Sequence, residues 1–478
     1  MDLIETAAFI DGLWVEGDSR FEVTNPADGA VLCRVADLGA AETTLAIAAA
    51  HRAFPAWAAR TAKDRGAILR RWSDLILANA DGLARLMTAE QGKPLAEARG
   101  EVVYGASFID WFAEEAKRGH GQSIATPDPN KRLMSIQQPV GVCAAIAPWN
   151  FPIAMITRKV GPALAAGCTV VIKPAAETPL CALAIARLAV EAGVPDGVLN
   201  VVTGTDASAI GKALCDDPRV RKLSFTGSTP VGKILYAQCA GTVKKLSLEL
   251  GGNAPFIVFD DADLETAVEG AIASKYRNAG QTCVCANRLI VQSGIHDAFA
   301  ARLAEKVAAM KVGPGTGDGV TIGPLINDKA IAKVEALVRE ALDQGATATV
   351  GGARHALGGL YYQPTVLTGA TDQMRLFQEE IFGPVAPIVK FETEAQAIAL
   401  ANATPFGLAA YFFSRDVGRC WRVAEAIEAG MVGINEGLIS TEVAPFGGVK
   451  ESGLGREGAS EGLDEYLETK YLCFGGVR

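Results

Sequence analysis

Short apolar runs that alternate with helical stretches constrain the fold of this chain more than any other feature. Five such runs occur before residue 251, at 141–147, 168–173, 198–202, 222–225 and 243–250. The segments between them, such as that following Pro179, have helical composition. Strand, helix and strand at these intervals are typical of parallel βαβ units. The sequence therefore predicts a doubly wound α/β sheet in this part of the chain.

The segments on either side extend the pattern. Residues 40–119 are predicted to be helical because apolar side chains recur every three or four positions among Ala, Leu, Glu and Arg. A second series of strands and helices begins with the apolar run 256–259 and continues to about residue 433. We therefore expect two doubly wound α/β domains with a boundary near Leu250.

Two segments have the composition of strands that belong to neither domain core, 120–139 and 465–474. Exposed strand edges pair readily with another chain. We expect three units, and the third is a small β-flap through which subunits pair as a homodimer or homotetramer. The first unit covers 1–119 and 140–250, the second covers 251–464, and the β-flap covers 120–139 and 465–478.

Composition excludes several classes of protein. The 478 residues are 49% apolar and 21% charged, which is globular composition, and the net charge of −9 without a basic run argues against nucleic acid. The longest apolar stretch, 162–172, is shorter than the roughly 20 residues that span a bilayer. Ten cysteines are too few for a disulfide scaffold, and the acidic start lacks the zones of a signal peptide. We therefore expect a cytoplasmic protein with no membrane partner.

Cys283 is the best candidate nucleophile among the cysteines. It lies in the polar, glycine-containing stretch 278–288, between a predicted helix and a predicted strand. Such a turn exposes side chains and backbone N–H groups, which suits a reactive thiolate. The alternative is a structural loop cysteine. Together with Cys285 it could suggest a metal pair, but no second Cys/His cluster with ligand spacing completes a metal site.

Two other polar residues could act beside a nucleophile. Glu249 ends a predicted strand between leucines, and apolar surroundings should raise the pKa of its carboxyl toward that of a usable general base. Asn150 lies between Pro148 and Pro152, which fix the turn, so its amide could donate to a developing oxyanion. The alternative for Glu249 is an ordinary surface acid at a strand end, and the alternative for Asn150 is an ordinary asparagine in a turn.

The signals for a cofactor are indirect, because no Gly-x-Gly-x-x-Gly follows a predicted strand. In the segment 225–232 a strand leads into a helix, with Gly227 and Ser228 at the helix start, where free N–H groups would receive a phosphate. Lys173 ends another strand and would reach over the carboxyl edge of the sheet, where doubly wound folds bind ligands.

Most of these candidate residues lie in a series of short motifs along the chain. The motifs are Trp149-Asn150, Lys173-Pro174, Gly227-Ser-Thr-Pro-Val-Gly232, Glu249-Leu-Gly-Gly, Gly280-Gln-Thr-Cys283, Glu379-Glu-Ile-Phe-Gly-Pro384 and Pro445-Phe-Gly-Gly-Val-Lys-Glu-Ser-Gly453. Taken together, they resemble the aldehyde dehydrogenase superfamily over essentially the whole chain, in the same order and with the same spacing between the acid and the cysteine. Features of several segments further resemble the succinate-semialdehyde dehydrogenases within that family.

The resemblance implies a mechanism in which Cys283 attacks an aldehyde to form a thiohemiacetal. Its oxyanion is held by the Asn150 amide and the Cys283 N–H, and loss of a hydride leaves a thioester that Glu249 hydrolyses by activating water. The first expected unit then binds NAD or NADP, and the second is catalytic. By family position, Lys173 and Glu380 hold riboses, Ser228 and Trp149 face the pyrophosphate, and Phe382 packs near the nicotinamide.

The resemblance also implies the substrate and the cofactor preference. In the succinate-semialdehyde members the positions of Arg158, Arg277 and Ser440 bind a carboxylate, although either arginine could instead form a surface or interdomain ion pair. Ala176 stands where many NAD-preferring relatives carry Glu, so we expect NADP to be accepted unless Glu177, the next residue, takes over that role.

Cys285 has a predicted redox role, since a disulfide to Cys283 would protect the nucleophile from over-oxidation; packing under the loop is the alternative. Two other functions remain open: oxidation of a different ω-carboxylated aldehyde such as glutarate semialdehyde, or of a neutral aldehyde, and thiol-dependent ester hydrolysis.

Overall fold

The computed structural model describes residues 3–477 and contains two large sheets, each covered by helices. The first sheet runs in the order β19-β11-β10-β7-β8-β9-β1-β2, and its five central strands are parallel. Its strands are β1 (Ala8–Ile10), β2 (Leu13–Val15), β7 (Val142–Ile146), β8 (Thr169–Lys173), β9 (Leu199–Val201), β10 (Val220–Thr226), β11 (Lys245–Glu249) and β19 (Gly453–Leu454).

Apolar side chains cover both faces of this sheet. On one face Cys143 and Val170 pack with the helices α2–α6, and on the other Ala144 and Val171 pack with α1, α7 and α8. Strands buried on both faces are typical of parallel sheets, so the prediction of a doubly wound domain is confirmed. The helices are α1 (Ala40–Ala58), α2 (Ala62–Ala78), α3 (Ala80–Gln91), α4 (Leu95–Glu115), α5 (Ala154–Ala166), α6 (Pro179–Ala192), α7 (Ala207–Asp216) and α8 (Thr229–Cys239).

The second sheet runs in the order β14-β15-β16-β13-β12-β17-β18 and is parallel apart from β14. Its strands are β12 (Ala254–Val258), β13 (Ala286–Gln292), β14 (Thr347–Val350), β15 (Thr365–Thr368), β16 (Val385–Phe391), β17 (Ala409–Phe413) and β18 (Met431–Ile434). Its helices are α9 (Leu264–Lys275), α10 (His296–Ala308), α11 (Asp328–Asp343), α12 (Arg375–Gln378), α13 (Glu394–Asn402) and α14 (Val417–Ala426).

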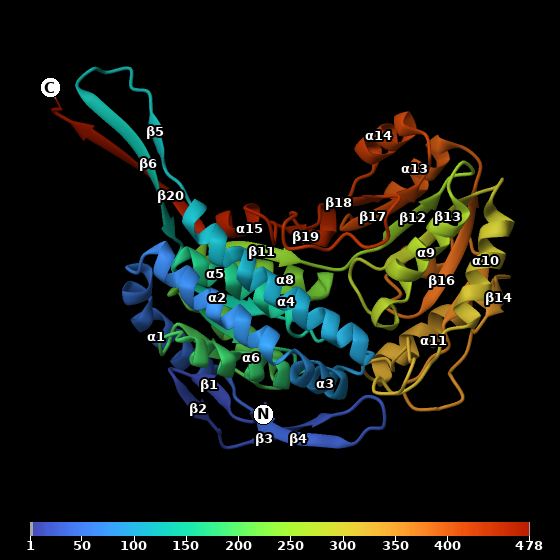
Figure 1. Ribbon diagram of the computed structural model, residues 1–478, viewed down its shortest axis with the longest axis horizontal. Coiled ribbons are helices and arrows are strands. Elements are labelled where there is room, and N and C mark those ends of the chain that lie inside the picture. Colours follow the sequence, from blue (N-terminus) through green and yellow to red (C-terminus); the bar gives the residue numbers. More distant parts are fainter. Residues whose placement is uncertain (1–2, 478) are drawn as a thin grey trace.

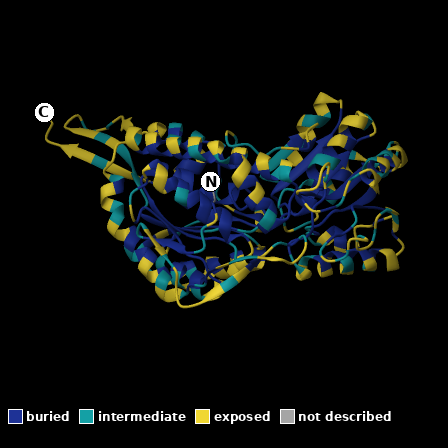
Figure 2. Cartoon of the chain, turned by 60° about the horizontal axis from the view of Figure 1, so that its bottom comes forward, coloured by how far each residue is buried: buried dark blue, intermediate teal, exposed yellow. Residues whose placement is uncertain are grey.

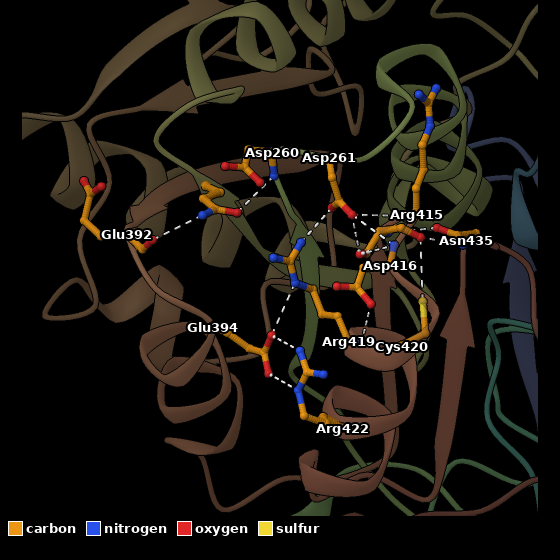
Figure 3. A network of polar contacts seen from close by, with 12 residues as sticks. Asp260, Asp261, Glu392, Glu394, Arg415, Asp416, Arg419, Cys420, Arg422 and Asn435 are labelled. Atoms are coloured by element: carbon orange, nitrogen blue, oxygen red, sulfur yellow. Dashed lines mark hydrogen bonds and ion pairs between the residues drawn. The ribbon is translucent and has the colours of Figure 1, made fainter.

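A polar network fastens the helices at one end of the second sheet (Figure 3). Asp261, just after β12, accepts hydrogen bonds from the Ser414 hydroxyl and from the Arg415 and Asp416 N–H groups. Its other carboxylate oxygen accepts a hydrogen bond from the Arg419 guanidinium, which also forms an ion pair with Glu394. One carboxylate thereby ties β12 to the turn after β17 and to α13 and α14.

Three strands form a separate flap that extends away from both sheets (Figure 1). They are β5 (Gln122–Ile124), β6 (Lys131–Pro139) and β20 (Leu467–Gly475), and β6 pairs with β20 along nine residues of each strand. The two segments predicted as strands of neither core therefore pair with each other. Figure 2 shows that most of the flap is exposed, whereas the central strands of both large sheets are buried.

The C-terminal part of the expected unit 251–464 lies on the first sheet instead of the second. β19 pairs antiparallel with β11, and Leu463 and Tyr466 pack in the core on one face of that sheet. The close approach depends on Gly453, where a Cβ would lie 1.8 Å from the Leu248 carbonyl oxygen. The shorter elements are the hairpin β3 (Arg20–Thr24) and β4 (Val31–Ala36), and the helix α15 (Glu461–Asp464).

Candidate active site

A cavity of about 470 Å³ opens beyond the carboxyl ends of β7 and β10. These strands are neighbours in the first sheet, but the chain continues from β7 to β8 on the other side, so they mark the topological switch point where such folds bind ligands. The cavity brings together residues that the sequence predicted for catalysis or cofactor binding. They are Asn150, Cys283, Trp149, Gly227, Ser228, Glu380 and Phe382.

The groups around this cavity fit a dinucleotide. Ser228 is exposed at the start of α8, whose first N–H groups can receive a phosphate. Glu380 accepts a hydrogen bond from the Gly252 N–H (3.0 Å), and burial raises the pKa of its carboxyl to about 7. The rings of Trp149 and Phe382 meet edge to face with their centroids 5.6 Å apart, so aromatic groups from both domains line the same cavity.

Lys173 and Ala176 are not among the residues that line this cavity. Lys173 ends β8, the strand next to β7, and burial lowers the pKa of its ammonium group, although Glu177 and Asp37 partly oppose this. Ala176 is partly exposed, and Glu177 is exposed. Glu177, one residue beyond Ala176, is thus an exposed acid that acts electrostatically on Lys173.

A strained turn presents Cys283. Asn278 and Ala279 have φ angles of 51° and 54°, and Gly280 continues the left-handed backbone with 75°. A Cβ at Gly280 would lie 2.1 Å from the Gly383 carbonyl oxygen, so the turn and the loop before β16 approach closely only because this residue is glycine. Burial raises the pKa of the Cys283 thiol to about 12, while Arg158 opposes the rise. The thiol therefore needs a proton acceptor before it attacks.

Asn150 is buried in the turn between β7 and α5, and its side-chain amide donates to the Gln281 carbonyl in the Cys283 turn (3.0 Å). An amide has a second N–H, which leaves one donor for a ligand. Gln281 therefore links the predicted oxyanion donor to the turn that carries the predicted nucleophile, and both residues line the first cavity.

Glu249 ends β11 and is only 2% exposed. Burial raises the pKa of its carboxyl well above the usual value, and the neighbouring Glu457 adds to the rise. This is the direction that its apolar surroundings predicted. Among residues 3–477 neither carboxyl oxygen has a hydrogen-bond partner. Burial thus favours the protonated acid, whereas positive charge or water that reaches the carboxyl favours the base.

A second cavity meets the first at Cys283. Its lining includes Arg158, Arg277 and Ser440, the three residues predicted to bind a carboxylate. Arg158 is buried over the Phe446 ring (4.2 Å from the guanidinium carbon to the centroid), and Arg277 lies over Phe151 (4.8 Å). The predicted carboxylate ligands thus share one cavity with the predicted nucleophile.

Glu457 is a charged group of this region to which the sequence assigned no role. It forms buried ion pairs with both Arg158 and Lys159. Burial alone would lower the pKa of Arg158, but Glu457, together with Tyr104, Glu249 and Cys283, raises it and keeps the guanidinium charged. Arg158 therefore forms an ion pair, but a buried one and not the surface pair offered as an alternative. It still lines the cavity, where its Nη2 has no hydrogen-bond partner within the described chain.

Cys285 faces away from the cavities. Its thiol is buried and donates to the Lys275 carbonyl oxygen at 3.1 Å. Burial raises its pKa. A bond to Cys283 would require this part of the loop to turn. Neither cysteine belongs to a metal-binding group, and residues 3–477 contain no cluster of three or more potential metal ligands.

Comparison with known proteins identifies the family. The model of the "Aldehyde dehydrogenase family" matches residues 14–472. Succinate-semialdehyde dehydrogenase [NADP(+)] of Escherichia coli K12 is 59% identical over 99% of this chain and 98% of its own. 3-Sulfolactaldehyde dehydrogenase of Pseudomonas putida is also 59% identical, with the same two coverages. Glutarate-semialdehyde dehydrogenase of Pseudomonas aeruginosa is 58% identical over 99% of both chains.

Solved structures with a similar fold indicate the same family. Succinate-semialdehyde dehydrogenase from Burkholderia pseudomallei superimposes with a TM-score of 0.98 at 61% identity, covering 99% of this chain and 98% of the other. Betaine aldehyde dehydrogenase from Staphylococcus aureus in complex with NAD+ gives 0.96 at 37% identity, covering 99% and 96%. No helix within residues 3–477 is long and apolar enough to cross a membrane. With the two sheets, the cavity at the switch point and Cys283 between two cavities, these similarities show that the chain belongs to the aldehyde dehydrogenase family.

Proposed function

We propose that this enzyme oxidises succinate semialdehyde to succinate with NAD or NADP. The observation that carries the proposal is the position of Cys283 where two cavities meet. One cavity suits a dinucleotide, and the other offers Arg158, Arg277 and Ser440 to a carboxylate. An aldehyde that carries a carboxylate at its far end therefore fits this arrangement, with its carbonyl at Cys283 and its carboxylate in the second cavity. The relatives named for carboxylated semialdehydes support this substrate class.

Each of the three catalytic residues has one task in this mechanism. Cys283 gives its proton to water and attacks the aldehyde carbon as a thiolate, and the Asn150 amide with the Cys283 N–H stabilises the oxyanion of the thiohemiacetal. When bound, the nicotinamide would supply a hydride acceptor. Lys173 and Glu380 would hold the riboses of the cofactor, Ser228 and Trp149 would face its pyrophosphate, and Phe382 would pack near the nicotinamide. Loss of the hydride leaves a thioester on Cys283. Glu249 then takes a proton from water, and the resulting hydroxide releases the acid.

The direct test measures reduced nicotinamide by its absorbance when the purified enzyme receives aldehyde and cofactor. We expect kcat/KM for succinate semialdehyde to exceed that for butanal by at least about 100-fold, because a bidentate guanidinium–carboxylate pair in a buried site discriminates strongly. Glutarate semialdehyde tests the alternative chain length. A ratio near one between succinate semialdehyde and butanal would reject the carboxylate site.

We also propose that NADP is accepted. A methyl group at position 176 neither binds the 2′-hydroxyl nor repels a 2′-phosphate. Steady-state constants with both cofactors check this. Ala176→Glu should move the preference toward NAD by about tenfold, because it adds a carboxylate beside that of Glu177, which repels the 2′-phosphate of NADP. A hundredfold NAD preference in the unaltered enzyme would show that Glu177, next to Lys173, already acts as that acid.

The redox role of Cys285 is a third proposal. Peroxide should oxidise Cys283 to a sulfenic acid, and attack by Cys285 should then release water and form a disulfide. Because Cys285 points toward Lys275, the loop has to turn, and the strained bond should be reduced easily by dithiothreitol. Intact mass should fall by about two units with loss of activity, and both should recover. Equal recovery in Cys285→Ala would leave Cys285 without this role.

The assembly that we propose uses the flap. Its strands β5, β6 and β20 form a small exposed sheet away from both cores, which suits pairing with a second copy of the chain in a homodimer or homotetramer. Light scattering of the intact enzyme measures the oligomeric state.

A further inference from the structure

We propose that Lys93, held by Glu101, is a positioning residue that fixes the Asn150 turn for the reaction at Cys283. This inference rests on the function proposed above. Lys93 lies in the short connection between α3 and α4 and is 1% exposed. Its ammonium group donates to the Asn150 carbonyl oxygen at 2.7 Å and to a Glu101 carboxylate oxygen at 2.5 Å. A buried charge thus binds the backbone of the residue that supplies the oxyanion donor.

Glu101 holds the other end of the same turn. Its second carboxylate oxygen accepts the N–H groups of Ile153 (3.0 Å) and Ala154 (3.3 Å), at the start of α5. The Lys93 ammonium group also lies 3.9 Å from the centroid of the Phe151 ring. The ion pair therefore contacts every residue from 150 to 154 except Pro152. These contacts leave the turn between β7 and α5 little freedom to tilt.

The nucleophile turn is tied to the same place. Asn278 donates from its side chain to the Asn150 carbonyl oxygen (3.1 Å), so this oxygen receives both Lys93 and Asn278. The backbone N–H of Asn278 donates to Glu97 (2.8 Å), and Gln91 donates to its side-chain oxygen (3.1 Å). Residues 91–101 thus hold the oxyanion donor and the nucleophile turn together, although the two belong to different domains.

Stability alone does not require a charge at this position. Burial lowers the pKa of Lys93, while Glu101 opposes the shift, so the pair is costly to desolvate. Apolar side chains of similar size would often fill such a space with equal or greater stability. A lysine has a donor that apolar groups lack, and here it is directed at the Asn150 carbonyl. Fixing that carbonyl also fixes the direction of the Asn150 side chain toward Cys283.

The test uses the double variant Lys93→Met/Glu101→Gln. It removes both buried charges, keeps a long side chain over Phe151, and keeps an acceptor for the N–H groups at the start of α5. We expect a folded enzyme whose kcat with succinate semialdehyde falls by about 10–100-fold while both KM values stay within about threefold, because a small misplacement of a catalytic group costs this much. A kcat within about twofold of the unaltered enzyme would overturn the proposal.

A thermodynamic cycle separates positioning from a general structural defect. If Lys93 acts through Asn150, the double variant should lose little further activity in the Asn150→Ala background. If the loss in kcat from the Lys93/Glu101 substitutions and the loss from Asn150→Ala multiply when combined, Lys93 acts elsewhere and the inference is overturned. Should Lys93→Met/Glu101→Gln fail to fold, Lys93→Arg, which keeps the charge but shifts the donor, enters the same cycle with the same two outcomes.

Glu90 provides the matched control. It is 0% exposed, lies near the end of α3, and accepts the N–H groups of Leu180 and Cys181 at the start of α6 (2.8 Å each), as Glu101 does for α5. Glu90→Gln should therefore perturb a buried helix cap without changing kcat. The rates of the unaltered enzyme and of Asn150→Ala test the proposed function independently, so a failure of that function and a failure of the Lys93 inference give different results.

Discussion

Replacing Cys283 by alanine is expected to reduce turnover with succinate semialdehyde by at least about 10³-fold, because no other group can form the thioester. Cys283 alone among the cysteines lines both cavities. Burial holds its thiol protonated at neutral pH, so the reaction depends on a proton acceptor as well as on the sulfur. Initial rates of nicotinamide reduction under saturating conditions measure the loss. Activity like that of the unaltered enzyme would refute the mechanism.

Cys285→Ala is the control for this experiment. Cys285 lies two residues away in the same turn, but its thiol binds the Lys275 carbonyl oxygen and contacts neither cavity. We expect its turnover to stay within about threefold of the unaltered enzyme, since removal of a buried thiol leaves only a small void. A large loss in both variants would point to collapse of the turn rather than to loss of the nucleophile.

Arg277→Ala should lower kcat/KM for succinate semialdehyde by about 10²–10³-fold and leave butanal within about threefold. The expected loss corresponds to removing one side of a desolvated charge pair. Arg277 is better suited to this test than Arg158, because Arg158 also neutralises Glu457 and its removal would leave that carboxylate with only Lys159.

The conservative variant Arg277→Lys separates charge from geometry. It keeps the positive charge over Phe151 but cannot bind a carboxylate through two parallel N–H groups. We expect an intermediate kcat/KM for succinate semialdehyde. An equal loss for both aldehydes in Arg277→Ala would show that the arginine supports the Phe151 wall and does not recognise a carboxylate.

Local patterns were sufficient to predict which candidate residues lie at strand ends of the first sheet. Glu249, Lys173 and the Gly227-Ser228 turn each follow an apolar run, and a parallel sheet must bring such positions to one edge. The turn that carries Asn150 was recognisable because two prolines enclose it. These predictions needed no knowledge of distant contacts.

The supporting residues were not predictable in this way. Glu101 lies within a long helix, where a glutamate is normally a solvated surface residue, and Lys93 lies in a short connection. Only the packing of α4 against α5 buries the pair and directs it at Asn150. Glu457 is similar, because it reaches Arg158 from almost 300 positions along the chain. A single sequence gives no sign of which distant charges will meet.

The return of the C-terminal segment to the first sheet has a consequence for biosynthesis. β11 pairs with β19, and the buried cations Arg158 and Lys159 pair with Glu457. The partners of these early residues are therefore translated about 200 to 300 positions later. At about 5–20 residues per second, a ribosome needs roughly 10–40 s to bridge the 200-residue interval. During that time the sheet has an open edge and two cations without their anion. The nascent chain is therefore most vulnerable to aggregation while its second domain is still being translated.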